Sequence, residues 1–116
     1  MLYSQRNPLK TRQVDITNLY ITISGDAAAP TFGGIDKAIV KSIARVSKGV
    51  FKITLRSTAR RPLFMVGVAP ITEDAVINVV ASDNESITVK CKIGAVLEDD
   101  TDANLTIGYH GYTTLF

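Results

Sequence analysis

The side chains that most often carry chemistry are scarce in this sequence and lie far apart. His110 is the only histidine and Cys91 the only cysteine among 116 residues. Because a metal centre normally gathers several His, Cys or carboxylate ligands, one of each is a poor supply. A serine nucleophile is not indicated either, since the chain has no G-x-S-x-G turn. We therefore expect no catalytic residues, no metal site and no cofactor, and we interpret the chain as a non-enzymatic protein.

Carboxylates are dense at one place, where a Ca²⁺ site has to be considered. The stretch GAVLEDDTDA contains Glu98, Asp99, Asp100 and Asp102. It lacks the glycine and the closing glutamate of an EF-hand loop. We expect this acidic stretch to be a solvated loop.

Cys91 lies in the alternating run SITVKCKI, which predicts a small strand residue. It has no second cysteine with which to form an internal disulfide, and no nearby base that would activate the thiol. The chain contains no apolar run of 18 residues, and its N-terminus lacks the apolar region of a signal peptide. We expect no membrane span and a protein that is made inside a cell.

Most of the chain consists of short runs in which apolar and polar residues alternate. In the first run Leu19, Ile21 and Ile23 point one way, and Tyr20 and Thr22 point the other. Turn signals recur every 8–12 residues, which is typical of antiparallel sandwiches and barrels. The predicted strands cover 14–24, 40–46, 50–55, 62–69, 75–82, 86–93 and 104–116. The sequence therefore predicts an all-β fold, a single antiparallel β-sandwich or barrel-like domain of about seven short strands over residues 14–116.

The region 35–56 allows two interpretations. As a helix, residues 35–46 would place their apolar side chains on one face and their cations on another. As a hairpin, the run VFKITL has the two-residue period of a strand, and Ser47-Lys48-Gly49 supplies the turn. We favour the hairpin, and a short helical turn near 35–39 stays open. The first strand is then expected to turn Val40, Ser42, Ala44 and Val46 inward, and Lys41 and Arg45 outward.

Residues 1–13 differ in composition from the periodic part and predict an extended N-terminal arm. They contain three cations, no acid and a proline. Such a segment has too few apolar groups to fold alone, so it is either a disordered tail or a segment ordered by contact with a partner. Under the second hypothesis, the arm residues that bind the partner are Leu2, Tyr3, Arg6, Leu9, Lys10 and Arg12.

Charge is distributed unevenly along the chain, although the net charge is only +2. Eight cations and no acid lie between residues 37 and 61, whereas eight acids and two cations lie between 73 and 102. Opposed patches could steer copies of one protein toward each other, although outward strand positions are often charged for solubility alone. We predict that the cations of the hairpin bind a partner, namely Lys41, Arg45, Lys48, Lys52 and Arg56.

Nucleic acid is the alternative partner for these cations. Lys48, Lys52 and Arg56 on one strand face could follow a line of phosphates. Proteins that bind single strands usually add stacking aromatics on the same face, whereas Phe51 is expected to point the other way. A small nucleic-acid-binding β-domain therefore stays the second interpretation.

Two segments of the chain resemble a group of small tailed-bacteriophage virion proteins. The first is the hairpin with GVFKITL, and the second is the closing stretch TDANLTIGYHGY, preceded by a strand like SITVKCKI. The resemblance spans about residues 40–112 and departs from the group at Ser47-Lys48, where a glycine is often found. The matching residues are Arg45, Gly49, Val50, Phe51, Ile53, Leu55, Asp102, Ala103, Leu105 and Ile107.

Members of this group are similar to capsid decoration, or cement, proteins and other minor head components. The resemblance implies a structural protein that binds the capsid surface and stabilises the shell, in a virion assembled in the host cytoplasm. Its partners would be the major capsid protein and neighbouring copies of itself, as a homo-trimer or dimer. The group has no catalytic residues to transfer, and neither a membrane nor nucleic acid is the expected partner.

Overall fold

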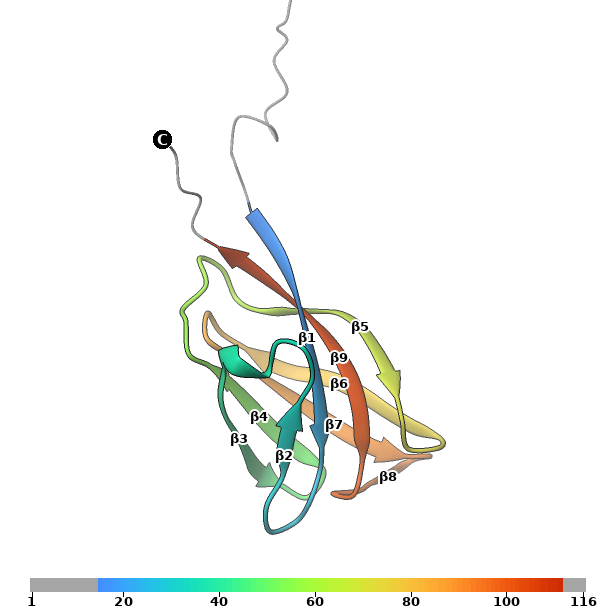
Figure 1. Cartoon of the computed structure of the whole chain (residues 1–116). Helices are drawn as coiled ribbons and strands as arrows, with labels where there is room; N and C mark the ends of the chain where they lie inside the picture. The colour runs from blue at the N-terminus through green and yellow to red at the C-terminus, as the bar shows by residue number, and fades with distance from the viewer. Residues whose placement is uncertain (1–14, 112–116) are drawn as a thin grey trace, which may run out of the picture.

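The computed structural model describes residues 15–111, and this region is almost entirely β-structure. Within it, nine strands form two antiparallel sheets that pack face to face (Figure 1). The only helical element of the described region is a single 3₁₀ turn, η1 (Lys37–Ile39). The prediction of an all-β sandwich is therefore confirmed. The predicted arm, residues 1–13, and the last five residues of the predicted final strand lie outside the described residues.

The first sheet, called the β1–β9 sheet here, has the strand order β2-β1-β9-β5. Its strands are β1 (Asp15–Ser24), β2 (Thr31–Gly33), β5 (Phe64–Pro70) and β9 (Asp102–Gly111). β1 and β9 pair in one unbroken register over ten residues, with Asp15 opposite Gly111 and Ser24 opposite Asp102. This long central pair holds together the two chain ends of the described domain.

The second sheet, called the β4–β7 sheet, has the order β3-β4-β7-β6. It contains β3 (Val40–Ser47), β4 (Val50–Leu55), β6 (Ala75–Ser82) and β7 (Ser86–Ile93), and the short β8 (Val96–Leu97) pairs with the end of β7. The turn before β7 is held by Asp83, whose Oδ1 accepts the N–H groups of Glu85 and Ser86. Asp is favoured in turns for this kind of bond.

The predicted hairpin is confirmed, since β3 and β4 are joined through Lys48 and Gly49. Gly49 has a φ of 72°, a left-handed conformation that costs glycine less than any other residue. The helical turn that the sequence left open near 35–39 is η1.

The predicted facing of β3 is wrong after its first residue. The register shifts between Val40 and Ser42, after which Ile43 lies opposite Ile53 and Arg45 lies opposite Phe51. Because a bulge inserts one residue, it reverses the alternation of faces. Ile43 and Arg45 therefore share the side of Ile53 and Phe51, although Arg45 stays exposed at the edge of the sheet. The residues expected to point inward after Val40 are exposed on the other side, namely Ser42, Ala44 and Val46.

The core lies between the two sheets and follows the alternation of their strands. Leu19, Ile21 and Ile23 are buried, as the sequence predicts, while Tyr20 between them is 49% exposed. Aliphatic side chains and one phenylalanine fill the space, and each buried Ile, Leu or Phe contributes roughly 1.5–3 kcal/mol. The largest fully buried side chains are Phe51, Ile21, Ile23, Ile53, Leu55, Leu63, Ile87, Leu105, Ile107, Val40, Val89 and Thr101.

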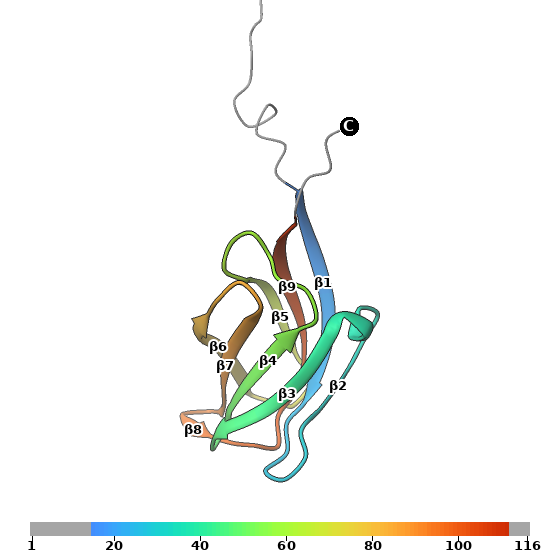
Figure 2. The same cartoon turned by 90° about the vertical axis from the view of Figure 1, so that its left-hand side faces the viewer.

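Different segments close the two ends of the sandwich (Figures 1 and 2). At the end where the termini lie, segment 56–63 hydrogen-bonds to segment 83–85 and to the backbone of His110, and it buries Ala59 and Leu63 in the core. At the opposite end the loop after β8 crosses between the sheets, with the Thr101 carbonyl accepting the Gly25 N–H at 2.8 Å. These two segments determine the positions of Arg60 and Arg61 at one end of the sandwich and of Asp99 at the other.

Candidate partner-binding surfaces

The five predicted cations of the hairpin region do not form one surface. Lys52 lies on the outer face of the β4–β7 sheet, opposite Thr88, and Lys48 is in the turn. Lys41 is exposed at the bulge of β3, and the Arg56 Nε donates to the Ala38 carbonyl at the other end of the sandwich. Arg45 lies on the side of Ile53 and Phe51, as described above. The six predicted residues of the arm lie outside the described residues.

Arg45 is engaged within the domain rather than free for a partner. Its Nε lies 2.9 Å from Asp99 Oδ1, and its Nη2 lies 3.1 Å from Asp99 Oδ2. This two-point geometry is the strong form of an arginine–carboxylate pair. The Arg45–Asp99 pair therefore ties the edge strand β3 to the loop between β8 and β9.

Asp99 also accepts the N–H of Gly49 at 2.8 Å, so one carboxylate holds both the turn and the strand of the hairpin. The hydrogen bond from Arg45, followed by the one from Gly49, lowers the pKa of Asp99 below its ordinary value. Asp99 is only 9% exposed, and the expectation of a solvated acidic loop is therefore wrong for this residue. Nothing in the sequence distinguishes Asp99 from its acidic neighbours.

The acidic residues of the second half of the chain are divided between the two ends of the sandwich. Asp83 and Glu85 lie beside the cationic segment 56–63, where the Asp83 carbonyl accepts the N–H of Leu63. Glu98, Asp99 and Asp100 lie at the other end, and the Asp102 carbonyl there accepts the N–H groups of Ile71 and Thr72. The two opposed patches along the sequence are thus not kept apart in the fold, because each end of the sandwich has both cations and acids, with Arg45 and Lys48 beside Asp99 at the far end.

The outer face of the β1–β9 sheet has almost no charge. The outward residues of β1 are Ile16, Asn18, Tyr20, Thr22 and Ser24, and their partners on β9 are His110, Gly108, Thr106, Asn104 and Asp102. Phe64 of β5 covers Gly108, where a Cβ would lie 2.2 Å from the Phe64 ring, and this ring lies 5.3 Å from that of His110. By contrast, the outer face of the β4–β7 sheet has lysine at positions 52, 90 and 92.

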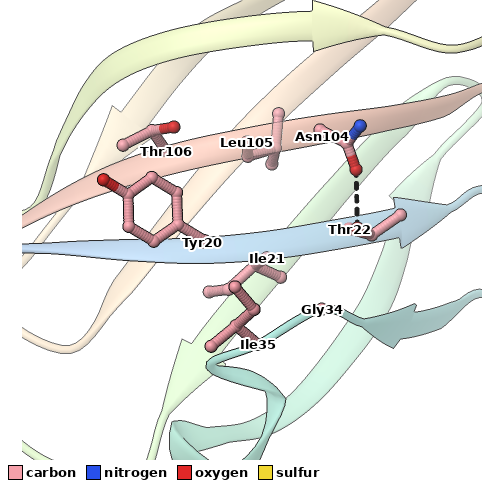
Figure 3. A pocket seen from close by; sticks show the side chains of 8 residues that line it. All are labelled: Tyr20, Ile21, Thr22, Gly34, Ile35, Asn104, Leu105 and Thr106. Carbon is pink, nitrogen blue, oxygen red and sulfur yellow. Dashed lines mark hydrogen bonds between the residues drawn. The ribbon is translucent and has the colours of Figure 1, made fainter.

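A groove of about 250 Å³ opens on this uncharged face beside Tyr20 (Figure 3). The Tyr20 ring and the side chain of Ile35, which is 86% exposed, provide its apolar surface. At one end Thr22 Oγ1 and Asn104 Oδ1 form a hydrogen bond of 2.6 Å across the strands. The volume is below the roughly 300–1,000 Å³ of small-molecule sites, so the groove is better suited to one side chain of a partner.

The edge of β1 is uncovered over its N-terminal half. β2 pairs only with residues 22–24 of β1, and Asp36 bonds both backbone groups of Tyr20, with N–O distances of 2.7 and 3.1 Å. Among the described residues, no strand pairs with residues 15–19 on this side (Figure 2). Because backbone groups in a strand point alternately to its two sides, those of Ile16 and Asn18 face the same open side as those of Tyr20.

The only cysteine and the only histidine are both placed within packed parts of the domain. Cys91 is fully buried, and this burial raises its pKa to about 11. It is the small strand residue that the sequence predicts. His110 is half-buried, and its Nδ1 has no hydrogen-bond partner within the described region.

Neither a known protein family, nor a curated protein, nor a solved structure matches this chain. Residues 15–111 contain no group of three or more His, Cys, Asp or Glu side chains that could hold a metal ion. In the same part of the chain no helix is long and apolar enough to cross a membrane.

Proposed function

We propose that the protein is a non-enzymatic structural component of a bacteriophage virion. It binds the capsid surface as a decoration or cement protein that stabilises the shell, and its partners are the major capsid protein and neighbouring copies of itself. The proposal combines the resemblance of residues 40–112 to small virion proteins with a β-sandwich that offers an uncharged face.

The outer face of the β1–β9 sheet is the observation that carries the proposal. Interfaces between proteins are depleted of charge at their centre and enriched in aromatic residues. Tyr20 and Ile16 are 49% and 56% exposed on this face, and Ile35 stands beside it. A partner that covers the face around Tyr20 would bury these apolar groups, and the one acid among the outward residues of β1 and β9, Asp102, lies at the end of the strand pair.

Attachment to particles tests the proposal. We expect the protein to be present in purified virions at a fixed copy number that mass spectrometry can measure. Added back to particles that lack it, the wild-type protein should bind to saturation, and Tyr20→Lys should bind at least about tenfold more weakly, because a charge at the centre of an interface must be desolvated. Val76→Lys is the matched control, since Val76 is 46% exposed on the opposite outer face.

Failure of the wild-type protein to bind particles would contradict the proposal, as would equal binding by the two lysine variants. Nucleic acid is the competing outcome, and it would appear as retardation of labelled DNA or RNA with a steep dependence on salt. The exposed positions of Lys48 and Lys52 favour that outcome. Arg45 does not, because its guanidinium is paired with Asp99.

A further inference from the structure

We propose that the uncovered edge of β1 pairs with the same edge of a second copy, so that two β1–β9 sheets join into one continuous sheet. The inference rests on the self-association in the proposed function and names the strand that performs it. An edge strand with free backbone donors and acceptors is a template for another strand.

The other three sheet edges of the described domain are interrupted. β3 has two register shifts and carries Arg45 on its inner side, and β5 and β6 have one shift each. Bulges and inward charges of this kind protect edges from pairing with another chain. β1 has no register shift over ten residues. It is therefore the edge of this domain best suited to accept a strand.

A second copy fits this edge better than an unrelated strand does. Antiparallel pairing of a segment with itself has two-fold symmetry, so every donor of one copy meets an acceptor of the other. Residues 16–19, Ile-Thr-Asn-Leu, carry no charge that would repel the same segment. The interface also closes on itself and limits the assembly to two copies.

The chain before β1 adds a second argument for the same occupant. Antiparallel pairing centred near Thr17 would place Asp15 of one copy opposite Leu19 of the other, next to its Tyr20 and Asp36, and fourteen residues precede Asp15 in the sequence. This segment contains Arg6, Lys10 and Arg12 and no acid. Its charge is therefore opposite to that of Asp36, whose carboxylate caps the end of the open edge.

Amide hydrogen exchange on the full-length protein, followed by NMR, tests the pairing directly. The N–H groups of Ile16 and Asn18 face the open edge, whereas those of Thr17 and Leu19 face β9. At high protein concentration we expect Ile16 and Asn18 to exchange at least about tenfold more slowly than at low concentration. Thr17 and Leu19 should be protected at both concentrations and serve as internal controls.

Sedimentation of variants gives an independent reading. Asn18→Pro removes one donor of the open edge but none of the β1–β9 hydrogen bonds, and Ile16→Lys places a charge on the edge. Both should stay folded by circular dichroism and sediment as monomers at concentrations where the wild type and the Val76→Lys control are dimers. The Ile16→Lys variant keeps the test decisive if the proline variant does not fold.

Three results would overturn the inference. A wild-type protein that stays monomeric at millimolar concentration would exclude the pairing. Protection of Ile16 and Asn18 that does not change with concentration would show that the chain's own segment covers the edge. A dimer that persists in both edge variants would place the interface elsewhere. These experiments use the free protein without particles, so a negative result would refute the β1 pairing but would not refute binding to the capsid.

Discussion

Arg45 on β3 and Asp99 in the loop after β8 are 54 residues apart in the chain, yet two hydrogen bonds join their side chains. Arg45 lies opposite Phe51 at the edge of its sheet. The Arg45 side chain is still 35% exposed, whereas that of Asp99 is only 12% exposed, so the pairing compensates mainly the carboxylate for its lost hydration. The same carboxylate receives the Gly49 N–H, so the pair closes this end of the sandwich.

The stabilisation from Asp99 should depend on pH. Because its pKa is lowered in the folded protein, the carboxylate stabilises the fold above the ordinary carboxyl pKa of about 4, and this contribution is lost as the pH falls through the lower folded value. We expect Asp99→Asn to lower the free energy of unfolding by urea at pH 7. The difference from the wild type should shrink as the pH falls below about 4.

Asp100→Asn is the control for this experiment, because Asp100 belongs to the same loop but is exposed. It should change the free energy of unfolding little at any pH. A deficit of Asp99→Asn that is the same at neutral and at acidic pH would contradict the assigned role of the carboxylate.

Gly49 should tolerate no side chain, for two separate reasons. Its φ of 72° strains other residues, and a Cβ would lie 2.7 Å from the carbonyl oxygen of Cys91. We expect Gly49→Ala to lower the free energy of unfolding by about 1–3 kcal/mol. Gly94 has a φ of 63° but open space around it, so Gly94→Ala measures the backbone cost alone. Equal losses in the two variants would show that the contact with Cys91 has no effect.

The Cys91 thiol should be unreactive in the folded protein. Burial raises its pKa to about 11, so it is protonated and shielded at pH 8. We expect a thiol reagent such as Ellman's to react at the rate at which the domain opens, and at once after unfolding in urea. Rapid stoichiometric labelling of the folded protein at pH 8 would be inconsistent with the buried position.

Deletion of residues 1–13 tests the arm hypothesis. Residues 1–13 precede β1 and contain too few apolar groups to form part of a core of their own, so we expect the truncated protein to keep its β-type circular dichroism and its melting temperature. Attachment to particles should weaken, because each anchor such as Tyr3 or Leu9 could contribute roughly 1.5–3 kcal/mol on burial. Equal particle binding by the truncated and full-length proteins would rule out the arm as an attachment device.

The strands could be predicted from the sequence because alternation is a local property. The run from Leu19 to Ile23 and the run VFKITL each bury every second residue, as their patterns indicate. The facing of Arg45 could not be predicted in this way, because a single inserted residue at Lys41 reverses the alternation without leaving a signal in composition.

The candidate surfaces are formed by strands that are distant in the chain, so the sequence predicted which side chains point outward but not which of them become neighbours. Tyr20 was expected to point away from the core, and it does. Its neighbours Asn104 and Thr106 come from β9, and the order of strands that brings them together is not written in any local pattern. Asp99 lies among exposed acids of the same type, and only the path of its loop makes it the partner of Arg45.

The pairing of Asp15 with Gly111 has a mechanical consequence. A pull applied between the two ends of the domain acts across the β1–β9 pair, in the direction of its hydrogen bonds. These bonds would then break one after another from the terminal end, and the domain would unfold at a small force. A pull on β1 alone, along its length and against the opposite end of the sandwich, loads all the bonds of the pair together. We therefore expect a higher unfolding force when β1 is pulled along its length than when the two ends of the domain are pulled apart.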